Sequence, residues 1–125
     1  MTFQGVVLFA HGARDPRWAE PFAAVVARIR ADCPGLPVVL AFLEHLQPDL
    51  ITALRDLASR GLSKVRVVPL FLGQGGHLRE DLPRLLEHAR RQVPQLEVEV
   101  TEAAGEDLSV QAALAAFALR RSELT

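Results

Sequence analysis

Short apolar runs alternate four times with segments of helical periodicity, and this alternation restricts the fold more than any other feature of the chain. The runs span residues 5–10, 38–43, 64–72 and 96–100. Short runs rich in β-branched residues are typical of strands, and strands that alternate with helices form a parallel sheet. The sequence therefore predicts an α/β fold, a three-layer sandwich with helices on both faces of a four-stranded parallel sheet.

The last apolar run indicates the order of the strands. It reads Leu-Glu-Val-Glu-Val, so that Glu97 and Glu99 alternate with apolar residues. Alternation of this kind is typical of a strand with one wet face at the edge of a sheet. Together with the doubly wound pattern, it predicts the strand order 2-1-3-4.

The first two predicted helices have clear start and stop signals. Asp15 followed by Pro16 marks the start of the first helix, because Asp caps free N–H groups and Pro suits the first helical position. Pro48 opens the second helix, and Gly61 is placed to end it in the left-handed conformation. Pro69 lacks a donor and is expected at the end of the third strand rather than in its middle.

The two remaining helices follow the third and fourth strands. Pro83 is expected near the start of the third helix, because proline is poorly tolerated further inside. The last helix is predicted from Asp107 to about Arg121. Four of its apolar residues recur in phase, as on a helix that packs through one face: Val110, Leu114, Phe117 and Ala118.

The bulk properties exclude several classes of protein. The 14 Lys and Arg residues nearly balance the 15 Asp and Glu residues, which argues against a nucleic-acid partner. No apolar run approaches the ~20 residues that a membrane span needs. Cys33 is the only cysteine, so the chain has no disulfide framework. We expect one domain over residues 1–125, located in the cytoplasm, without a membrane partner.

Polar residues that follow the strands mark a candidate site. His11 follows the first strand, Glu44 and His45 follow the second, and His77 follows the third after a bend. Ligands of parallel sheets bind beyond the carboxyl ends of the strands. Imidazole is the commonest metal ligand of proteins and takes up protons near neutral pH. Converging histidines and a carboxylate would bind a divalent ion; the alternative is histidines on surface loops without a common site.

The glycine-rich segment GQGGH (73–77) has two interpretations. Gly75 and Gly76 would let a flat ligand approach the backbone closely, or they would only let the chain turn. The segment lacks the GxxxxGK[ST] pattern of a nucleotide-binding loop, and the exit of the first strand lacks GxGxxG. Arg14, Arg17 and Arg79 lie near the same edge, either to pair with ligand carboxylates or as solvated side chains. Arg14, Gly75, Gly76 and Arg79 are the predicted substrate contacts.

Three segments carry a resemblance to a known family: HGARDP (11–16), AFLEHLQPDL (41–50) and VVPLFLGQGGHLREDLP (67–83). They resemble the short class II chelatases, the small CbiX-type sirohydrochlorin chelatases of the cobalamin and sirohaem pathways. The resemblance runs from about residue 4 to residue 119. It implies the chelatase, flavodoxin-like fold. It also implies that the chain is one half of the two-half architecture of longer relatives, and therefore a homodimer.

The resemblance also implies roles for individual residues. His11 and His77 correspond to the two active-site histidines, which hold the metal and accept pyrrole protons. Glu44 corresponds to the acidic residue that faces the same cleft. Ala13 departs from the family, which has a serine there, and residues 102–106 match it poorly.

The expected activity is insertion of Co²⁺ or Fe²⁺, with Ni²⁺ as a further candidate, into sirohydrochlorin without ATP. The metal is a substrate, and no permanently bound cofactor is expected. Two alternatives stay open from the residues alone. One is a carrier that binds the metal or the tetrapyrrole without catalysis. The other is a flavodoxin-like module for a phosphorylated ligand, against which the missing phosphate loop counts.

Overall fold

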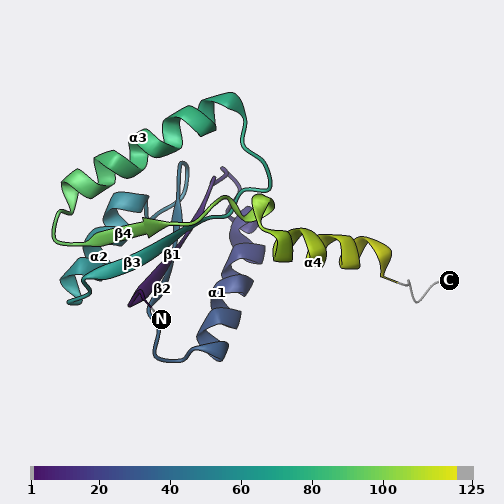
Figure 1. The fold of residues 1–125 in the computed structure, drawn as a ribbon, viewed down its shortest axis with the longest axis horizontal. Helices are drawn as coiled ribbons and strands as arrows, with labels where there is room; N and C mark the ends of the chain where they lie inside the picture. Colours follow the sequence, from purple (N-terminus) through teal and green to yellow (C-terminus); the bar gives the residue numbers. More distant parts are fainter. Residues whose placement is uncertain (1, 121–125) are drawn as a thin grey trace.

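The sheet has the predicted strands in the predicted order. The structure, a computed structural model, describes residues 2–120 without the side chain of His77. Four parallel strands form one sheet in the order β2-β1-β3-β4 (Figure 1). Their bounds are β1 (Gly5–Ala10), β2 (Val38–Phe42), β3 (Lys64–Pro69) and β4 (Glu97–Val100). Pro69 ends β3, as predicted from its missing donor.

Helices cover the two faces of the sheet unequally. On one face, Val7 and Phe9 of β1 belong to a core that includes Leu54 of α2 (Leu50–Ser59) and Leu86 of α3 (Gly76–Gln92). On the other face, Val6 and Leu8 pack with Val26 of α1 (Glu20–Asp32). All six residues of β1 are buried, because successive side chains point to opposite faces and both faces of this strand are covered.

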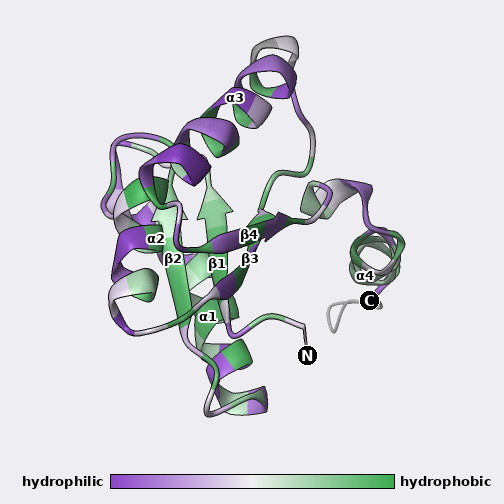
Figure 2. Ribbon diagram, turned by 60° about the vertical axis from the view of Figure 1, so that its left-hand side comes forward, coloured by the Kyte–Doolittle hydropathy of each residue, from purple (hydrophilic) through white to green (hydrophobic). Residues whose placement is uncertain are grey.

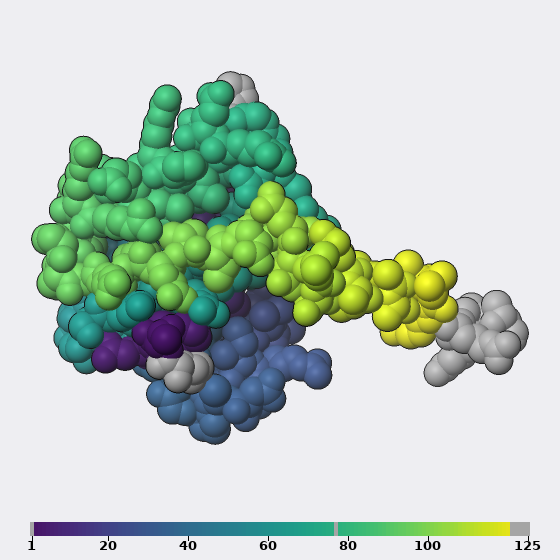
Figure 3. All heavy atoms as spheres, viewed as in Figure 1, coloured from purple at the N-terminus to yellow at the C-terminus, as the bar shows by residue number. Residues whose placement is uncertain are grey.

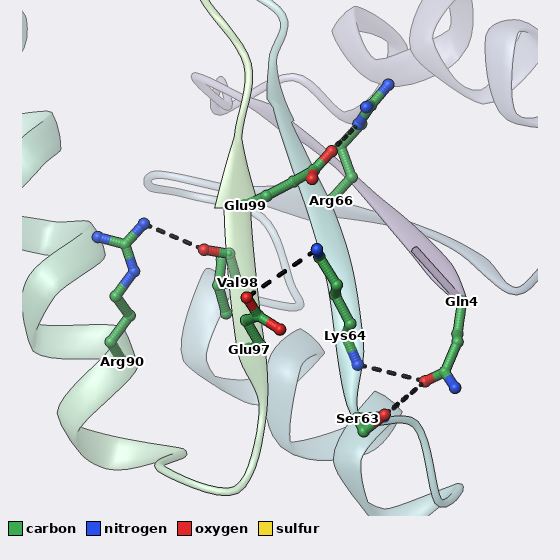
Figure 4. A network of polar contacts seen from close by, with 8 residues as sticks. All are labelled: Gln4, Ser63, Lys64, Arg66, Arg90, Glu97, Val98 and Glu99. Atoms are coloured by element: carbon green, nitrogen blue, oxygen red, sulfur yellow. Dashed lines mark hydrogen bonds and ion pairs between the residues drawn. The ribbon is translucent and has the colours of Figure 1, made fainter. Parts of the chain in front are cut away.

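The edge strand β4 is held by charged pairs as well as by its ladder. Glu97 pairs with Lys64 at 3.9 Å, and Glu99 pairs with Arg66, both across to β3 (Figure 4). Glu97 is exposed whereas Val98 is buried, which confirms the predicted alternation. On the far side, Arg90 of α3 donates to the carbonyl of Val98 at 3.1 Å. Charges on an edge strand also disfavour pairing with another chain.

The first helix starts later than the sequence predicts. Asp15 does cap the turn, since its carboxylate accepts from the Arg17 N–H at 3.0 Å, but a short 3₁₀ helix over Pro16–Ala19 comes first. The α-helix begins only at Glu20. Pro21 explains the break, because it has no N–H to donate back to the preceding turn and is tolerated only in the first turn of a new helix.

Pro83 also differs from expectation. It is the eighth residue of α3, which begins at Gly76, and so it lies inside the helix. A proline there removes one backbone hydrogen bond and leaves the carbonyl of Arg79 without its amide donor. Both residues are exposed, so water can hydrate this carbonyl.

The second helix has a charged cap. The Asp49 carboxylate accepts from the Thr52 N–H at 2.8 Å, and this hydrogen bonding holds the pKa of Asp49 below its usual value. Gly61, after the helix, has φ +90°, which confirms its predicted left-handed conformation. The lowered pKa means that the Asp49 charge stabilises the fold above the unfolded-state pKa. This contribution is lost as the pH falls through the folded-state pKa.

Replacing Asp49 with alanine is expected to lower the free energy of unfolding by about 1 kcal/mol at neutral pH, because one N–H of the first turn loses its acceptor. Asp49→Asn keeps an acceptor oxygen and should lose less. It should also flatten the fall in stability between neutral pH and about pH 3. Urea unfolding at the two pH values measures both effects. Equal stability of the alanine variant and the unaltered protein would contradict the capping role.

The last helix contradicts the expectation that one face packs on the sheet. Helix α4 (Leu108–Leu119) has no buried residue and runs away from the sheet (Figures 1 and 2). The preceding turn, a 3₁₀ helix over Ala104–Glu106, sets this direction. Gly105 donates to the Phe71 carbonyl at 2.9 Å and lies so close to Leu72 that a Cβ would come within 1.8 Å of its carbonyl oxygen.

Two further observations concern the helices. Residue 121, the expected end of the last helix, lies outside the described residues. Among residues 2–120, no helix is both long and apolar enough to cross a membrane.

Candidate functional site

The loops after β1 and β2 bring a histidine and a carboxylate together. The backbone pairing of these strands continues past their ends. The Leu43 N–H donates to the Ala10 carbonyl at 2.9 Å, and the Glu44 N–H donates to the His11 carbonyl at 3.0 Å. The side chains then meet, with Nε2 of His11 3.0 Å from Oε1 of Glu44. The sequence placed both residues at this edge, and the structure brings them within hydrogen-bond distance.

Gly12 permits this close approach. Its φ is +94°, a conformation that side chains with a Cβ rarely adopt. A Cβ on Gly12 would lie 1.8 Å from the carbonyl oxygen of Glu44. The glycine of the HGARDP segment therefore has a backbone role, which is to let the two loops touch.

A second histidine lies beside the pair. His45 has φ +67°, and its Nε2 lies 3.7 Å from Oε1 of Glu44. Sequence reasoning placed His45 at the sheet edge but did not include it among the site residues. The contact depends on the left-handed conformation of His45, which the alternation of strands and helices does not predict.

The His11–Glu44 pair adds little to the stability of the fold. Both side chains are 50 % exposed, and ion pairs or hydrogen bonds at such positions contribute at most about 1 kcal/mol. The chemistry of the His11–Glu44 pair says more about function than its stability does. A carboxylate that accepts from one ring nitrogen fixes the imidazole tautomer and leaves the other nitrogen for a metal or a proton.

A cavity of about 590 Å³ opens next to His11. Its wall is largely apolar, and the His11 ring lies edge-on to Phe71 with 6.4 Å between ring centroids. The lining residues are His11, Leu43, Phe71, Gly73, Gly75, Gly76, Leu78, Asp81, Leu82 and Leu85. A mostly apolar wall with a few polar groups is typical of sites for small organic ligands. Among the lining residues, His11 and Asp81 carry the polar side chains.

The leucines of the apolar wall were not among the predicted site residues. Leu78, Leu82 and Leu85 follow one another at helical spacing on α3, a pattern that is typical of a core-facing stripe. The structure turns the first part of that stripe toward the cavity. Asp81 lines the cavity between them and belongs to the segment that resembles the chelatases.

His77 is the second residue of α3. Its neighbours Gly76 and Leu78 both line the cavity, so this helix turn borders it. The side chain of His77 lies outside the described residues, so the expected approach of His77 to His11 stays a prediction. Among the side chains that the structure describes, no three His, Cys, Asp or Glu residues are grouped to hold a metal ion.

The four predicted substrate-contact residues do not all line the same cavity. Gly75 and Gly76 line the cavity of His11. Arg14 is exposed on the loop after β1 and is not part of the lining. Arg79 donates to the Gln74 carbonyl at 3.3 Å and lines a neighbouring hollow of about 360 Å³. The structure therefore does not bring the two arginines and the two glycines together in one pocket.

Arg17, the third arginine at this edge, has a partner on its own loop. Its guanidinium donates to Asp15 at 2.7 Å, which raises the pKa of Arg17 and lowers the pKa of Asp15. Arg17 is thus engaged locally rather than turned toward the cavity.

Comparison with known protein families gives one match over most of the chain. Residues 5–120 match the CbiX family profile. Among curated relatives, a sirohydrochlorin cobaltochelatase of Methanococcoides burtonii is 32 % identical over 66 % of this chain and 63 % of its own length. A sirohydrochlorin cobaltochelatase of Saccharolobus solfataricus is 36 % identical over 66 % of this chain and 62 % of its own. The matched part is thus less than two thirds of the length of these relatives.

Solved structures share the fold. A putative cobalamin biosynthesis CbiX protein of Marinobacter aquaeolei superposes with a TM-score of 0.81 at 27 % identity, covering 91 % of this chain and 92 % of its own. The sirohydrochlorin chelatase SirB of Bacillus subtilis subspecies spizizenii, solved with cobalt, superposes with a TM-score of 0.75 at 24 % identity. This chain covers 49 % of that SirB chain, with 91 % of its own residues aligned. The likeness to SirB is one of fold.

Proposed function

This chain belongs to the CbiX family, and we propose that it inserts a divalent metal ion into a tetrapyrrole of the sirohydrochlorin type. The observation that carries the proposal is the contact between His11 and Glu44 beside an apolar cavity at the carboxyl ends of the strands. Curated relatives that share 32 % and 36 % of the aligned residues are named sirohydrochlorin cobaltochelatases, which supports the same substrate class.

The cavity supplies a way to hold the ring. The leucines of α3 and Phe71 offer an apolar surface for one side of the macrocycle, and Gly75 and Gly76 let it approach the backbone. The ring edge carries carboxylates, for which Arg14 and Arg79 are the proposed partners. Because the two arginines lie apart, they would contact different edges of the ring.

Insertion must remove water from the ion and protons from the pyrrole nitrogens. We assign metal binding and proton acceptance to His11 and His77, with Glu44 to orient His11 or to take a proton. A bound carboxylate raises the basicity of a ligating histidine and holds its ring in position. Nothing in this step uses ATP or a resident cofactor.

Histidine and carboxylate groups accept Co²⁺, Fe²⁺ and Ni²⁺, and ligand type alone does not choose between them. The names of the curated relatives favour cobalt as the first metal to test. The reaction is placed in the cytoplasm as part of this proposal, because the free thiol of Cys33 suits a reducing compartment.

The proposed assembly is a two-fold homodimer, the commonest closed assembly. A chain of 125 residues offers only one wall of a cleft to a large macrocycle. A second copy would supply the opposite wall.

An insertion assay tests the activity. Purified protein is mixed with sirohydrochlorin and with Co²⁺, Fe²⁺ or Ni²⁺ in turn, and absorbance follows the metallated product. We expect at least one metal to be inserted well above the spontaneous rate. Binding of the tetrapyrrole without acceleration for any metal would favour a carrier and overturn the proposal.

Replacing Glu44 with glutamine is expected to slow insertion about ten- to a hundredfold, as for other groups that orient a metal-binding histidine. The amide keeps the size of the side chain but removes its charge. Steady-state rates measured across a range of pH give the effect, because loss of the carboxylate should also change the pH profile. Glu97→Gln is the matched control, since Glu97 is exposed on the edge strand; equal slowing in both variants would contradict the role of Glu44.

A further inference from the structure

Two carboxylates lie at the site, and only one of them lines the cavity of His11. The Glu44 carboxylate is engaged with His11, since its Oε1 lies 3.0 Å from the ring Nε2. Glu44 is not among the described residues that line the cavity, whereas Asp81 is. Asp81 comes from a different element, as the sixth residue of α3. The two carboxylates therefore occupy different positions relative to a ligand in the cavity.

Asp81 differs from the wall to which it belongs. Three leucines of the same helix, Leu78, Leu82 and Leu85, line the cavity beside it. Among the lining residues that the structure describes, only His11 and Asp81 have side chains that can take up a proton. The few polar groups in a mostly apolar wall are typically the groups that orient a ligand or act on it. The position of Asp81 thus indicates a role toward the ligand.

The charge of Asp81 also has an ordinary structural role. Carboxylates near the N-terminus of a helix stabilise it, because the helix dipole is positive at that end. Glu80 offers the same charge one residue earlier on α3, is exposed, and is not among the described residues that line the cavity. The helix dipole therefore does not explain why a carboxylate stands in the apolar wall, and Glu80 provides a matched comparison.

Insertion of a divalent ion releases two protons from the macrocycle. Two pyrrole N–H bonds break, and both electron pairs stay on the nitrogens that bind the ion. The His11 ring can accept at most one of these protons, because Nε2 is engaged by the Glu44 carboxylate and only Nδ1 is left. A histidine nitrogen that holds the ion cannot accept a proton at the same time. Histidines that bind the metal therefore leave at least one proton to another group.

We propose that Asp81 is a catalytic residue of this reaction, whose carboxylate accepts one of the two pyrrole protons. The inference rests on the proposed function and gives its two carboxylates different roles: Glu44 orients His11, and Asp81 takes up a proton. One N–H bond of the macrocycle breaks and one O–H bond forms on Asp81. The charge of the entering ion balances the two protons that leave, so the step needs no oxidant, reductant or further reactant.

The exposure of Asp81 gives the proton a way out of the site. Asp81 is exposed, whereas the next residue, Leu82, is only 7 % exposed. Helix α3 lies along the top of the molecule, at its surface, in the view of Figures 1 and 3. A carboxylic acid formed at Asp81 can therefore release its proton to water and return to the ionised form before the next macrocycle binds.

Chemical rescue tests this role. Asp81→Ala removes the acceptor and leaves space in the cavity for a small carboxylate. Single-turnover rates are measured with protein in excess over sirohydrochlorin, using the metal that gives the highest rate in the insertion assay. We expect the variant to be about a hundredfold slower than the unaltered protein, the lower range for loss of a proton-transfer group. Formate should raise the rate of the variant about tenfold, in proportion to its concentration, without accelerating the unaltered protein.

Glu80→Ala is the matched control, because it removes a carboxylate from the same turn of α3 but outside the cavity. We expect it to insert the metal at the unaltered rate, with or without formate. Calorimetry with Co²⁺ alone should give the same affinity for Asp81→Ala as for the unaltered protein, because the metal is assigned to the histidines. Circular dichroism should show both variants folded, since both positions are exposed.

The outcomes separate Asp81 from the rest of the proposed function. A loss in Asp81→Ala that formate restores, with Glu80→Ala unaffected, would support proton acceptance by Asp81. A full insertion rate in Asp81→Ala would overturn the inference and leave the proposed function standing. A loss that formate does not restore, or a weaker affinity for Co²⁺ alone, would mean that Asp81 acts through the fold or on the metal, and would also overturn it. Absence of insertion by the unaltered protein would overturn both.

Discussion

Replacing His11 with alanine is expected to slow metal insertion by at least about a hundredfold, the lower range for loss of a proton-transfer group. The change removes both the imidazole and its 3.0 Å contact with Glu44. It should leave the free energy of unfolding within about 1 kcal/mol of the unaltered protein, because the contact is half exposed. Initial rates of insertion and urea unfolding measure the two effects separately.

Two further histidine variants serve as comparisons for the activity of His11→Ala. His77→Ala is expected to cause a loss of the same order, because the chelatase resemblance assigns both histidines to the reaction. His88→Ala is the matched control, since His88 is exposed on α3 and is not among the residues that line the cavity. Full activity of His11→Ala and His77→Ala would remove both residues from the mechanism. Equal losses in all three variants would point to a general effect on the fold.

Replacing Gly12 with alanine is expected to lower the free energy of unfolding by about 2–4 kcal/mol, among the larger effects of single substitutions. Two costs add. The backbone at φ +94° is strained for alanine, and the new Cβ would lie 1.8 Å from the Glu44 carbonyl oxygen. The loops must separate to relieve the clash, so Glu44 would move away from His11 and insertion should slow as well.

Gly35→Ala is the control for the glycine effect. A Cβ on Gly35 meets no atom within 4 Å, and its loop lies at the opposite end of the strands from His11. We expect a change of no more than about 0.5 kcal/mol, as for most surface substitutions. Thermal or urea unfolding of both variants gives the comparison. Similar stability of the Gly12 and Gly35 variants would mean that the two loops do not need their close approach.

Much of the fold could be predicted from local patterns. The buried run of β1 and the alternating Glu97 and Glu99 of β4 indicated which strands are central and which lies at the edge, and the structure has that order. These patterns can be recognised because a strand buried on one face alternates apolar and polar residues, whereas a strand buried on both faces is apolar throughout. Pro69 and Gly61 were placed correctly for a similar reason, since the backbone conformation of each is limited.

The candidate site was only partly predictable. His11 and Glu44 could be placed at one edge, because the carboxyl ends of parallel strands meet there. Their 3.0 Å contact depends on Gly12, and its need for a positive φ appears only when the two loops are packed together. Arg79 was predicted as a substrate contact and lines a hollow beside the cavity of His11, so its contact with the ligand stays a prediction.

Local sequence determined the strands, their order and the edge of the sheet at which chemistry can occur, because these features depend on periodicity and on a few residues with restricted backbone conformations. Tertiary structure alone decided the direction of α4. The apolar residues in phase on one face predicted packing on the sheet, but apolar residues lie on the other sides of the helix as well, so the pattern did not single out one packing face. The close fit of Gly105 against the Leu72 carbonyl, between segments far apart in the chain, turns the helix away from its own sheet. A contact between distant segments leaves no period in the sequence, and for that reason only the folded chain reveals it.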